Sequence, residues 1–279
     1  MHYDTAMPHY ITTLTIAGSD SSGGAGIQAD IKTMSALGCF ATSVITAVTA
    51  QNTTGVKAIH HIPADIIAAQ IDAVLDDMPP MAIKIGMISS AEAAQVICDR
   101  LRKVRVPIVL DPVMTSTSGH SLSAMPVMSY VMTHIAPLAT VITPNIPEAR
   151  LLSGMDISSA ADMTAAAKML ARNTGCNILL KGGHLGTGKT IDILVDREAK
   201  HETIYEHDRI DTRNLHGTGC TLSSAIASML AKGLPPQAAI AAATDYVHSC
   251  IRAGGNVSAG KGQGPLNHFS HPLALEIRE

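Results

Sequence analysis

The sequence Asn214-Leu215-His216-Gly217-Thr218-Gly219-Cys220-Thr221 runs directly into an apolar segment that extends from residue 222 to residue 231. Two glycines on either side of a small hydroxyl residue let the backbone bend so that several N–H groups point at one spot. Because apolar residues recur at helical spacing after this loop, we expect the loop to form the first turn of a helix. Unpaired N–H groups and the positive end of the helix dipole favour an anion there, most often phosphate.

The same loop places Cys220 where a helix dipole is expected to lower the pKa of a thiol. Taken alone, however, a short glycine motif is weak evidence for an anion site. A glycine-rich turn that caps an ordinary core helix explains Gly217-Thr218-Gly219 equally well. Whether this loop is an anion site or only a helix-capping turn depends on which other residues the fold brings to it.

The composition is that of an ordinary globular protein. The 279 residues are 46% hydrophobic and 15% charged, with a formal net charge of -3. Neither linkers nor internal repeats interrupt the chain, so we expect a single domain over residues 1–279. The chain has no basic runs, no Trp and only two Phe. We therefore expect no binding to nucleic acid and none to a membrane surface.

Cysteine usage and hydropathy together point to the cytoplasm. The five cysteines are scattered without a CxxC pair, which is typical of reduced thiols. Two long stretches without charged residues, 33–56 and 112–147, are broken by Gly, Pro, Asn or His, so we expect no membrane span. Residues 1–10 lack the basic and apolar regions of a secretory signal.

Short apolar runs alternate with amphipathic segments along the chain. The apolar runs predict strands at residues 11–17, 44–48, 82–85, 108–110, 141–143 and 178–180, and a hairpin from residues 191–195 and 203–205. Helices are predicted at residues 27–37, from 63 to about 78, from 89 to about 103, from 145 over a short length, and at 159–172, 220–231 and 236–252. Ser89-Ser90-Ala91-Glu92 is interpreted as a capping box, and residues 51–55 as a polar loop. Residues 254–264 are interpreted as a flexible tail or as a loop that closes on a ligand.

This alternation predicts an α/β fold in which helices cover both faces of a mostly parallel sheet. Ligands of such sheets bind beyond the carboxyl ends of the strands. Polar residues lie at those ends, namely Asp20, Gln51, residues 84–87, Asp111, Asn145, Lys181 and the Gly217–Cys220 loop. Together they suggest phosphoryl transfer, which needs an anion cradle, cations and a means of positioning the acceptor.

A divalent cation in such a site requires oxygen ligands, and Asp111 and Glu148 could hold one directly or through water. Two simpler interpretations stay open: Asp111 as a turn residue before Pro112, and Glu148 as a helix-cap partner of Asn145. The chain contains no GxxxxGK[ST] motif, so it is not a P-loop enzyme. Residues 18–26 fail the GxGxxG pattern, which argues against a dinucleotide site.

Six motifs occur in an order that matches one known family. They are the run from Ile16 to Asp30 (IAGSDSSGGAGIQAD), Thr46 to Asn52 (TAVTAQN), Lys84 to Met87 (KIGM), Thr143-Pro144-Asn145 with Glu148, Lys181 to His184 (KGGH) and His216 to Cys220 (HGTGC). From residue 11 to residue 269 the chain resembles the hydroxymethylpyrimidine and hydroxymethylpyrimidine-phosphate kinases of thiamine biosynthesis, members of the ribokinase-like superfamily.

The resemblance implies a ribokinase-like three-layer α/β/α sandwich, a homodimer, and the use of ATP and Mg²⁺. It implies phosphorylation of 4-amino-5-hydroxymethyl-2-methylpyrimidine, and then of that phosphate to a diphosphate. By the same resemblance, Gln51 and the backbone around Ala25 hold the pyrimidine, with Asp30, Met87 and Val113 nearby. Asn145 and Glu148 fall in the nucleotide and metal region, and Lys181 and the segment from Lys261 to residue 264 lie along ATP.

Two features depart from the wider pattern. Most of the superfamily carries an aspartate base where this chain has Cys220, whose thiolate could take the substrate proton or whose role could be purely positional. Many relatives have Lys-Ser-Gly-Asp where this chain has Thr117-Ser118-Gly119-His120, which bears on the second phosphorylation step. The alternatives are a pyridoxine or pyridoxal kinase and a non-catalytic pyrimidine-binding sensor.

Overall fold

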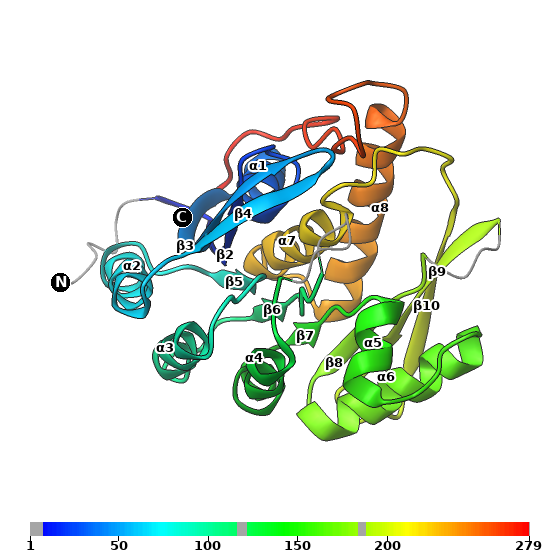
Figure 1. Ribbon diagram of the computed structural model, residues 1–279, viewed down its shortest axis with the longest axis horizontal. Coiled ribbons are helices and arrows are strands. Elements are labelled where there is room, and N and C mark those ends of the chain that lie inside the picture. The colour runs from blue at the N-terminus through cyan, green and yellow to red at the C-terminus, as the bar shows by residue number, and fades with distance from the viewer. Residues whose placement is uncertain (1–7, 116–121, 184–187, 279) are drawn as a thin grey trace.

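A nine-stranded sheet forms the middle of three layers in the computed structural model, which describes residues 8–115, 122–183 and 188–278 (Figure 1). The strand order is β10-β9-β8-β7-β6-β5-β2-β3-β4. The six central strands, β8-β7-β6-β5-β2-β3 in spatial order, run parallel to one another. Strands β4, β9 and β10 pair antiparallel with their neighbours. The strands are β2 (Thr12–Asp20), β3 (Phe40–Asn52), β4 (Gly55–His61), β5 (Ala82–Ile85), β6 (Ile108–Leu110), β7 (Val141–Ile142), β8 (Asn177–Lys181), β9 (Lys189–Val195) and β10 (Glu202–Asp208). A separate two-stranded sheet pairs β1 (His9–Tyr10) with β11 (Ile277–Arg278).

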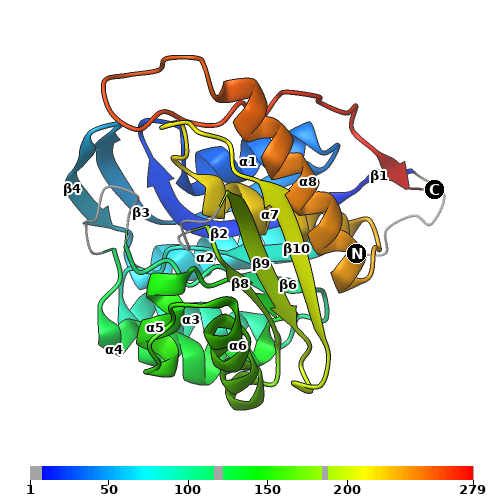
Figure 2. The same cartoon turned by 90° about the vertical axis from the view of Figure 1, so that its right-hand side faces the viewer.

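Helices cover both faces of this sheet (Figure 2). One face carries α1 (Gly26–Ala36), α7 (Thr218–Ala231) and α8 (Pro236–Gly254). The other carries α2 (Ala64–Asp77), α3 (Ala91–Leu101), α4 (Met125–Tyr130), α5 (Ile146–Ser153) and α6 (Ala160–Thr174), with a π-helical turn (Val131–Ile135) and a 3-10 turn (Ala136–Leu138) after α4. The predicted α/β fold with a mostly parallel central sheet is therefore confirmed.

Strands β5, β6, β7 and β8 each contribute apolar side chains to both cores in alternation. In β6, Val109 belongs to the core on the side of α7 and α8, whereas Ile108 and Leu110 belong to the core on the opposite face of the sheet. This is the period of two expected of a strand buried on both faces. Helix α7 is itself buried over most of its length, between the sheet and α8. Its first turn is consequently held in a fixed place at the edge where the parallel strands end.

The predicted strands and helices are found, with ends that shift by a few residues. Two interpretations were wrong, the loop at residues 51–55 and the cap of α3, and the elements β4 and α4 were not predicted. Residues 51 and 52 belong to β3 rather than to a loop. Strand β4, which forms a hairpin with β3, was not predicted because it is an edge strand without a continuous apolar run. No element was predicted between residues 112 and 140, where α4 begins with a proline in its first turn. The cap of α3 is Ser90, whose side chain accepts from Ala93 N, rather than Ser89.

Residues 255–264 follow α8 and cross to the β3–β4 hairpin. There Gly262 N donates to Thr53 Oγ1 at 3.0 Å, and Gln263 N donates to the Thr53 carbonyl at 3.1 Å. This segment thus lies against the hairpin turn. In the part of the chain that the structure describes, no helix has both the length and the apolar character to cross a membrane.

Candidate active site

The loop before α7 packs directly on the loop before α1. Gly217 is the N-cap residue of α7 and has φ +86°, a left-handed conformation that favours glycine. A Cβ at this position would lie 1.8 Å from the carbonyl oxygen of Gly24. Thr218, Gly219 and Cys220 form the first turn, in which the N–H groups of Gly219 and Cys220 have no acceptor within the helix. The prediction that this loop becomes the first turn of a helix is confirmed.

Cys220 is half-buried near both the Lys84 ammonium and two carboxylates. Burial raises the pKa of its thiol to about 11, and the carboxylates of Asp30 and Asp111 add to that effect while Lys84 opposes it. The prediction that the pKa of Cys220 is lowered was wrong, because burial and the neighbouring carboxylates outweigh the effect of the Lys84 ammonium. The thiol is protonated at neutral pH.

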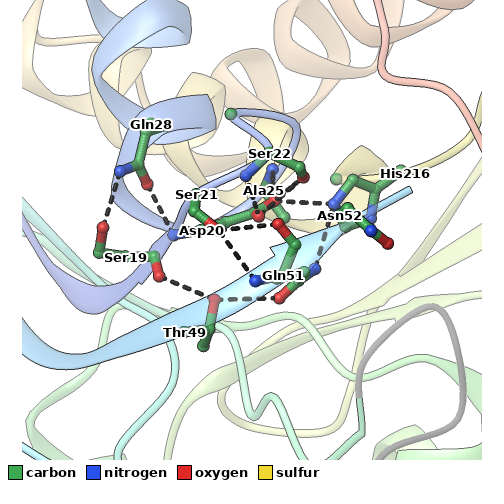
Figure 3. A network of polar contacts seen from close by, with 12 residues as sticks. Ser19, Asp20, Ser21, Ser22, Ala25, Gln28, Thr49, Gln51, Asn52 and His216 are labelled. Atoms are coloured by element: carbon green, nitrogen blue, oxygen red, sulfur yellow. Dashed lines mark hydrogen bonds and ion pairs between the residues drawn. The ribbon is translucent and has the colours of Figure 1, made fainter. Parts of the chain in front are cut away.

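Asp20, Gln51 and His216 form a hydrogen-bonded cluster at the ends of β2 and β3 (Figure 3). Asp20 Oδ2 lies 2.8 Å from His216 Nε2 and 2.9 Å from Ala25 N. Ser22 donates to the same carboxylate from its backbone and its hydroxyl. Burial raises the pKa of Asp20, but the hydrogen bonds from His216, Ser22 and Ala25 together lower it to about 2. The carboxylate thus ties the two glycine-rich loops together.

Gln51 is held by backbone and side chain alike. Gln51 N donates to Ser21 Oγ at 2.8 Å, and Ser21 Oγ donates to the Gln51 carbonyl at 2.7 Å. Gln51 and His216 face a cavity of about 420 Å³. The cavity is lined by Gln51, Asn52, Thr53, Thr54, His216, Gly262 and Gln263. It lies beside a predicted substrate residue and away from the predicted metal residues. Lys261, predicted to lie along ATP, is exposed on the segment that lines this cavity.

Asp111, Glu148 and Lys181 form a charged cluster on the other side of the Gly217–Cys220 loop. Lys181 Nζ lies 3.1 Å from Asp111 Oδ1. Thr143 and Ser223 also donate to the Asp111 carboxylate, at 3.1 and 3.3 Å. A Cβ on Gly219 would lie 3.3 Å from Lys181 Nζ and 3.5 Å from Asp111 Oδ2. The first turn of α7 therefore meets both a cation and a carboxylate.

Glu148 caps helix α5 and also lies near the charges of Asp111 and Lys181. Its carboxylate accepts from Asn145 N at 2.9 Å while Asn145 Oδ1 accepts from Glu148 N, so the two residues form a capping box for α5. The cap-partner interpretation of Glu148 is thus confirmed. Burial raises the pKa of Glu148 to about 7, with Lys181 opposing and Asp111 adding to the rise.

Two buried carboxylates that repel each other offer the oxygen-only donor set that Mg²⁺ prefers, so the residues present fit that ion. Among the described residues no group of three or more His, Cys, Asp or Glu forms a metal site, which is compatible with an ion that completes its shell with water and phosphate. The metal-binding roles of Asp111 and Glu148 remain predictions.

Asp30 lies in a fully buried ion pair with Lys84. Lys84 Nζ contacts the two carboxylate oxygens at 2.9 and 2.8 Å, and Thr15 and Ser224 donate to them at 2.6 and 2.7 Å. This pair joins β2, β5, α1 and α7 beneath Cys220. The prediction that Asp30 lies near the substrate stays a prediction.

The remaining predicted substrate residues surround the loop before α1 and the ends of β5 and β6. Ala25 is the N-cap of α1. Met87 is buried, and its carbonyl accepts from Thr46 Oγ1 at 2.7 Å. Val113 is half-buried and follows Asp111. Thr117 and His120 lie outside the described residues.

Sequence reasoning gave no role to Lys84 and His216, although both fall inside quoted motifs. The sequence signal that could have singled them out is their position, since Lys84 is a charged residue near the end of a strand and His216 is a titratable residue beside a glycine loop.

Comparison with known proteins identifies consistent relatives. The sequence pattern of the phosphomethylpyrimidine kinase family matches residues 20–267. A hydroxymethylpyrimidine/phosphomethylpyrimidine kinase from Rhizobium meliloti is 47% identical over 257 residues, which cover 92% of this chain and 96% of that protein. Among solved structures, a phosphomethylpyrimidine kinase from Clostridium difficile is 44% identical with a TM-score of 0.76, covering 86% of this chain and 99% of the other. The ADP complex of pyridoxal kinase from Bacillus subtilis is 33% identical with a TM-score of 0.86, covering 94% and 98%.

Sequence and backbone likeness rank these two structures differently. The pyridoxal kinase has the higher TM-score, whereas the phosphomethylpyrimidine kinase has the higher identity. Because one fold can host several substrates and the side chains of the site choose among them, identity carries more weight for function. Both likenesses agree on a ribokinase-like fold.

Proposed function

The chain belongs to the phosphomethylpyrimidine kinase family, and on this premise we propose that it is an ATP-dependent kinase of thiamine biosynthesis. It phosphorylates 4-amino-5-hydroxymethyl-2-methylpyrimidine and then converts that phosphate to the diphosphate. The observation that carries this proposal is the position of residues 216–219. His216 belongs to the hydrogen-bonded cluster, and Gly219, three residues later, lies against the charged cluster. An acceptor bound by the first cluster and a phosphate bound by the second would meet at the first turn of α7.

The residues divide the work of phosphoryl transfer. The hydroxymethyl oxygen of the substrate bonds to the γ-phosphorus of ATP, and the bond from that phosphorus to its bridging oxygen breaks, so that ADP leaves. The hydroxyl proton passes to water. The N–H groups of Gly219 and Cys220 face the transferring phosphoryl group, and Lys181 balances its charge. Asp111 and Glu148 are the residues that would hold Mg²⁺, directly or through water, and the ion when bound would supply positive charge for the phosphates.

The proposal gives Cys220 a positioning role. Its thiol has a pKa of about 11 and so keeps its proton at neutral pH. A loose phosphoryl-transfer transition state gains little from a base. Ala25, Gln51, Met87 and Val113 form the substrate side, as the resemblance implies.

The finer assignments are part of the same proposal. Asn145 and Lys261 belong to the nucleotide side, and the chain works as a single domain within a homodimer in the cytoplasm. The free state of all five cysteines supports the location. Size-exclusion chromatography with light scattering measures the oligomer directly, and a monomeric mass would contradict the homodimer.

The test supplies purified protein with ATP, Mg²⁺ and the hydroxymethylpyrimidine, and follows the monophosphate and diphosphate separately. Both products in succession are expected. Monophosphate alone would limit the chain to the first step and direct attention to Thr117 and His120. Omission of Mg²⁺, with a chelator present, should abolish both products.

The second candidate is a pyridoxal kinase, favoured by the TM-score of 0.86 to the Bacillus subtilis enzyme. A parallel reaction with pyridoxal separates the two. Product from pyridoxal alone would overturn the first proposal, whereas binding of the pyrimidine without turnover would support a sensor.

A further inference from the structure

The side-chain amide of Gln51 lies between two polar neighbours. In the orientation drawn in Figure 3, Gln51 Nε2 lies 3.3 Å from His216 Nε2, and Gln51 Oε1 lies 3.2 Å from Thr49 Oγ1. The oxygen and nitrogen of such an amide are assigned from the hydrogens that their neighbours carry. Both neighbours have a second partner that fixes where their hydrogen is.

His216 Nε2 also lies 2.8 Å from Asp20 Oδ2. The Asp20 carboxylate is ionised at neutral pH and can only accept, so His216 Nε2 carries a hydrogen. An N–H of Gln51 pointing at this nitrogen would find no lone pair to accept it. The Gln51 atom beside His216 is therefore the amide oxygen, which at 3.3 Å shares the Nε2 hydrogen with the Asp20 carboxylate.

Thr49 leads to the same orientation independently. Its hydroxyl has one hydrogen, which it donates to the carbonyl oxygen of Ser19 at 3.0 Å. A carbonyl oxygen only accepts, so Thr49 Oγ1 can offer Gln51 nothing but a lone pair. The Gln51 atom beside Thr49 is therefore the amide nitrogen. The two contacts agree on one orientation.

We infer that His216 and Thr49 are positioning residues that fix the amide of Gln51 for an aminopyrimidine ring, an inference that rests on the proposed function. The amide keeps one acceptor position on its oxygen and one N–H, and Gln51 faces the cavity. Such an edge pairs with a ring that has an amino group beside a ring nitrogen, as glutamine pairs with adenine. The 4-amino group and N3 of the proposed substrate form this edge, with the amino group toward His216. The ring of pyridoxal carries no amino group.

The test compares kcat/KM for the hydroxymethylpyrimidine with kcat/KM for its analogue that lacks the 4-amino group. In the wild type the ratio should be about tenfold or more, the usual discrimination of a two-point contact. Thr49→Val removes the lone pair offered to Gln51, whereas Thr49→Ser keeps it. His216→Leu removes the N–H, whereas His216→Gln keeps one. In Thr49→Val and His216→Leu the amide is no longer held in one orientation, so the ratio should fall toward one. In Thr49→Ser and His216→Gln the ratio should persist.

A merely structural role for these residues would lower both kcat/KM values together and leave the ratio unchanged, which would overturn the inference. A wild-type ratio near one would overturn it without any variant. Phosphorylation of neither pyrimidine by the wild type would instead defeat the proposed function. The KM for ATP, measured in every variant, reports whether the neighbouring Gly217–Cys220 loop has been disturbed.

Discussion

The hydrogen-bonded cluster and the charged cluster hold their carboxylates in opposite electrostatic states. Asp20 is surrounded by donors, and its pKa falls to about 2. Glu148 is buried beside a second carboxylate, and its pKa rises to about 7 despite Lys181. The first cluster is complete without a ligand, whereas the second would gain from an added cation. Under the proposed function, the first cluster would hold the acceptor, and the second would hold the metal and the nucleotide.

Removal of Lys181 should have the largest effect. Its ammonium lies 3.1 Å from Asp111 and faces the first turn of α7. With Lys181→Met, kcat should fall by about a hundredfold to a thousandfold, as when a group that stabilises transition-state charge is lost. The KM for the pyrimidine should change little, because the hydrogen-bonded cluster is untouched. Steady-state kinetics with each substrate varied measures both.

Lys200→Met is the matched control for that variant. Lys200 pairs with Glu198 at 2.8 Å on an exposed turn, so its loss should leave kcat near the wild-type value. A rise in pyrimidine KM in Lys181→Met, with kcat unchanged, would contradict the division between the clusters.

Glu148 should make the protein less stable as pH rises. Its folded pKa of about 7 exceeds the ordinary value of 4.5, so the folded state binds the proton more tightly than the unfolded chain. The free energy of unfolding should therefore fall by about 3 kcal/mol between those two pH values and level off above them. Urea unfolding at pH 5 and pH 8 measures the difference.

The variant Glu148→Gln isolates this contribution, because Asp192 also has a raised pKa and adds a dependence of the same sign. The difference between wild type and variant is the quantity to follow. Added Mg²⁺ should restore stability at high pH in the wild type only. If the free energy of unfolding depended on pH in the same way in the wild type and the variant, the pKa of Glu148 would not be raised in the folded protein.

Asp20 should behave in the opposite sense. Its folded pKa of about 2 lies below the ordinary 3.8, so its stabilisation is present above that value and is lost as pH falls toward 2. At neutral pH, Asp20→Asn should lower the free energy of unfolding by about 2 kcal/mol. It should also raise the KM for the pyrimidine while leaving the KM for ATP unchanged. A higher KM for ATP alone would reverse the assignment of the two clusters.

Much of this site could be predicted because parallel strands end at one edge of a sheet. Asp111 follows β6, Lys181 ends β8 and the Gly217–Cys220 loop opens α7, and local sequence indicates each of these positions. His216 and Lys84 act through partners 196 and 54 residues away, and no local pattern reports such contacts. The prediction that the pKa of Cys220 is lowered was wrong for the same reason. A helix terminus can be recognised from local sequence, whereas burial of the thiol, which raises this pKa most, and the nearby carboxylates of Asp30 and Asp111 depend on the fold.

The smallest effect should follow from Cys220→Ala. Loss of a general base usually costs a hundredfold to ten-thousandfold in rate, but a thiol with a pKa of about 11 holds its proton at neutral pH. We therefore expect kcat to fall by about tenfold or less, through looser packing at the first turn of α7. Cys220→Ser, which keeps a small polar side chain, should fall less. A loss as large as that of Lys181→Met, with a kcat in the wild type that climbs as pH approaches 11, would instead identify Cys220 as the base and would move the proton acceptor onto α7.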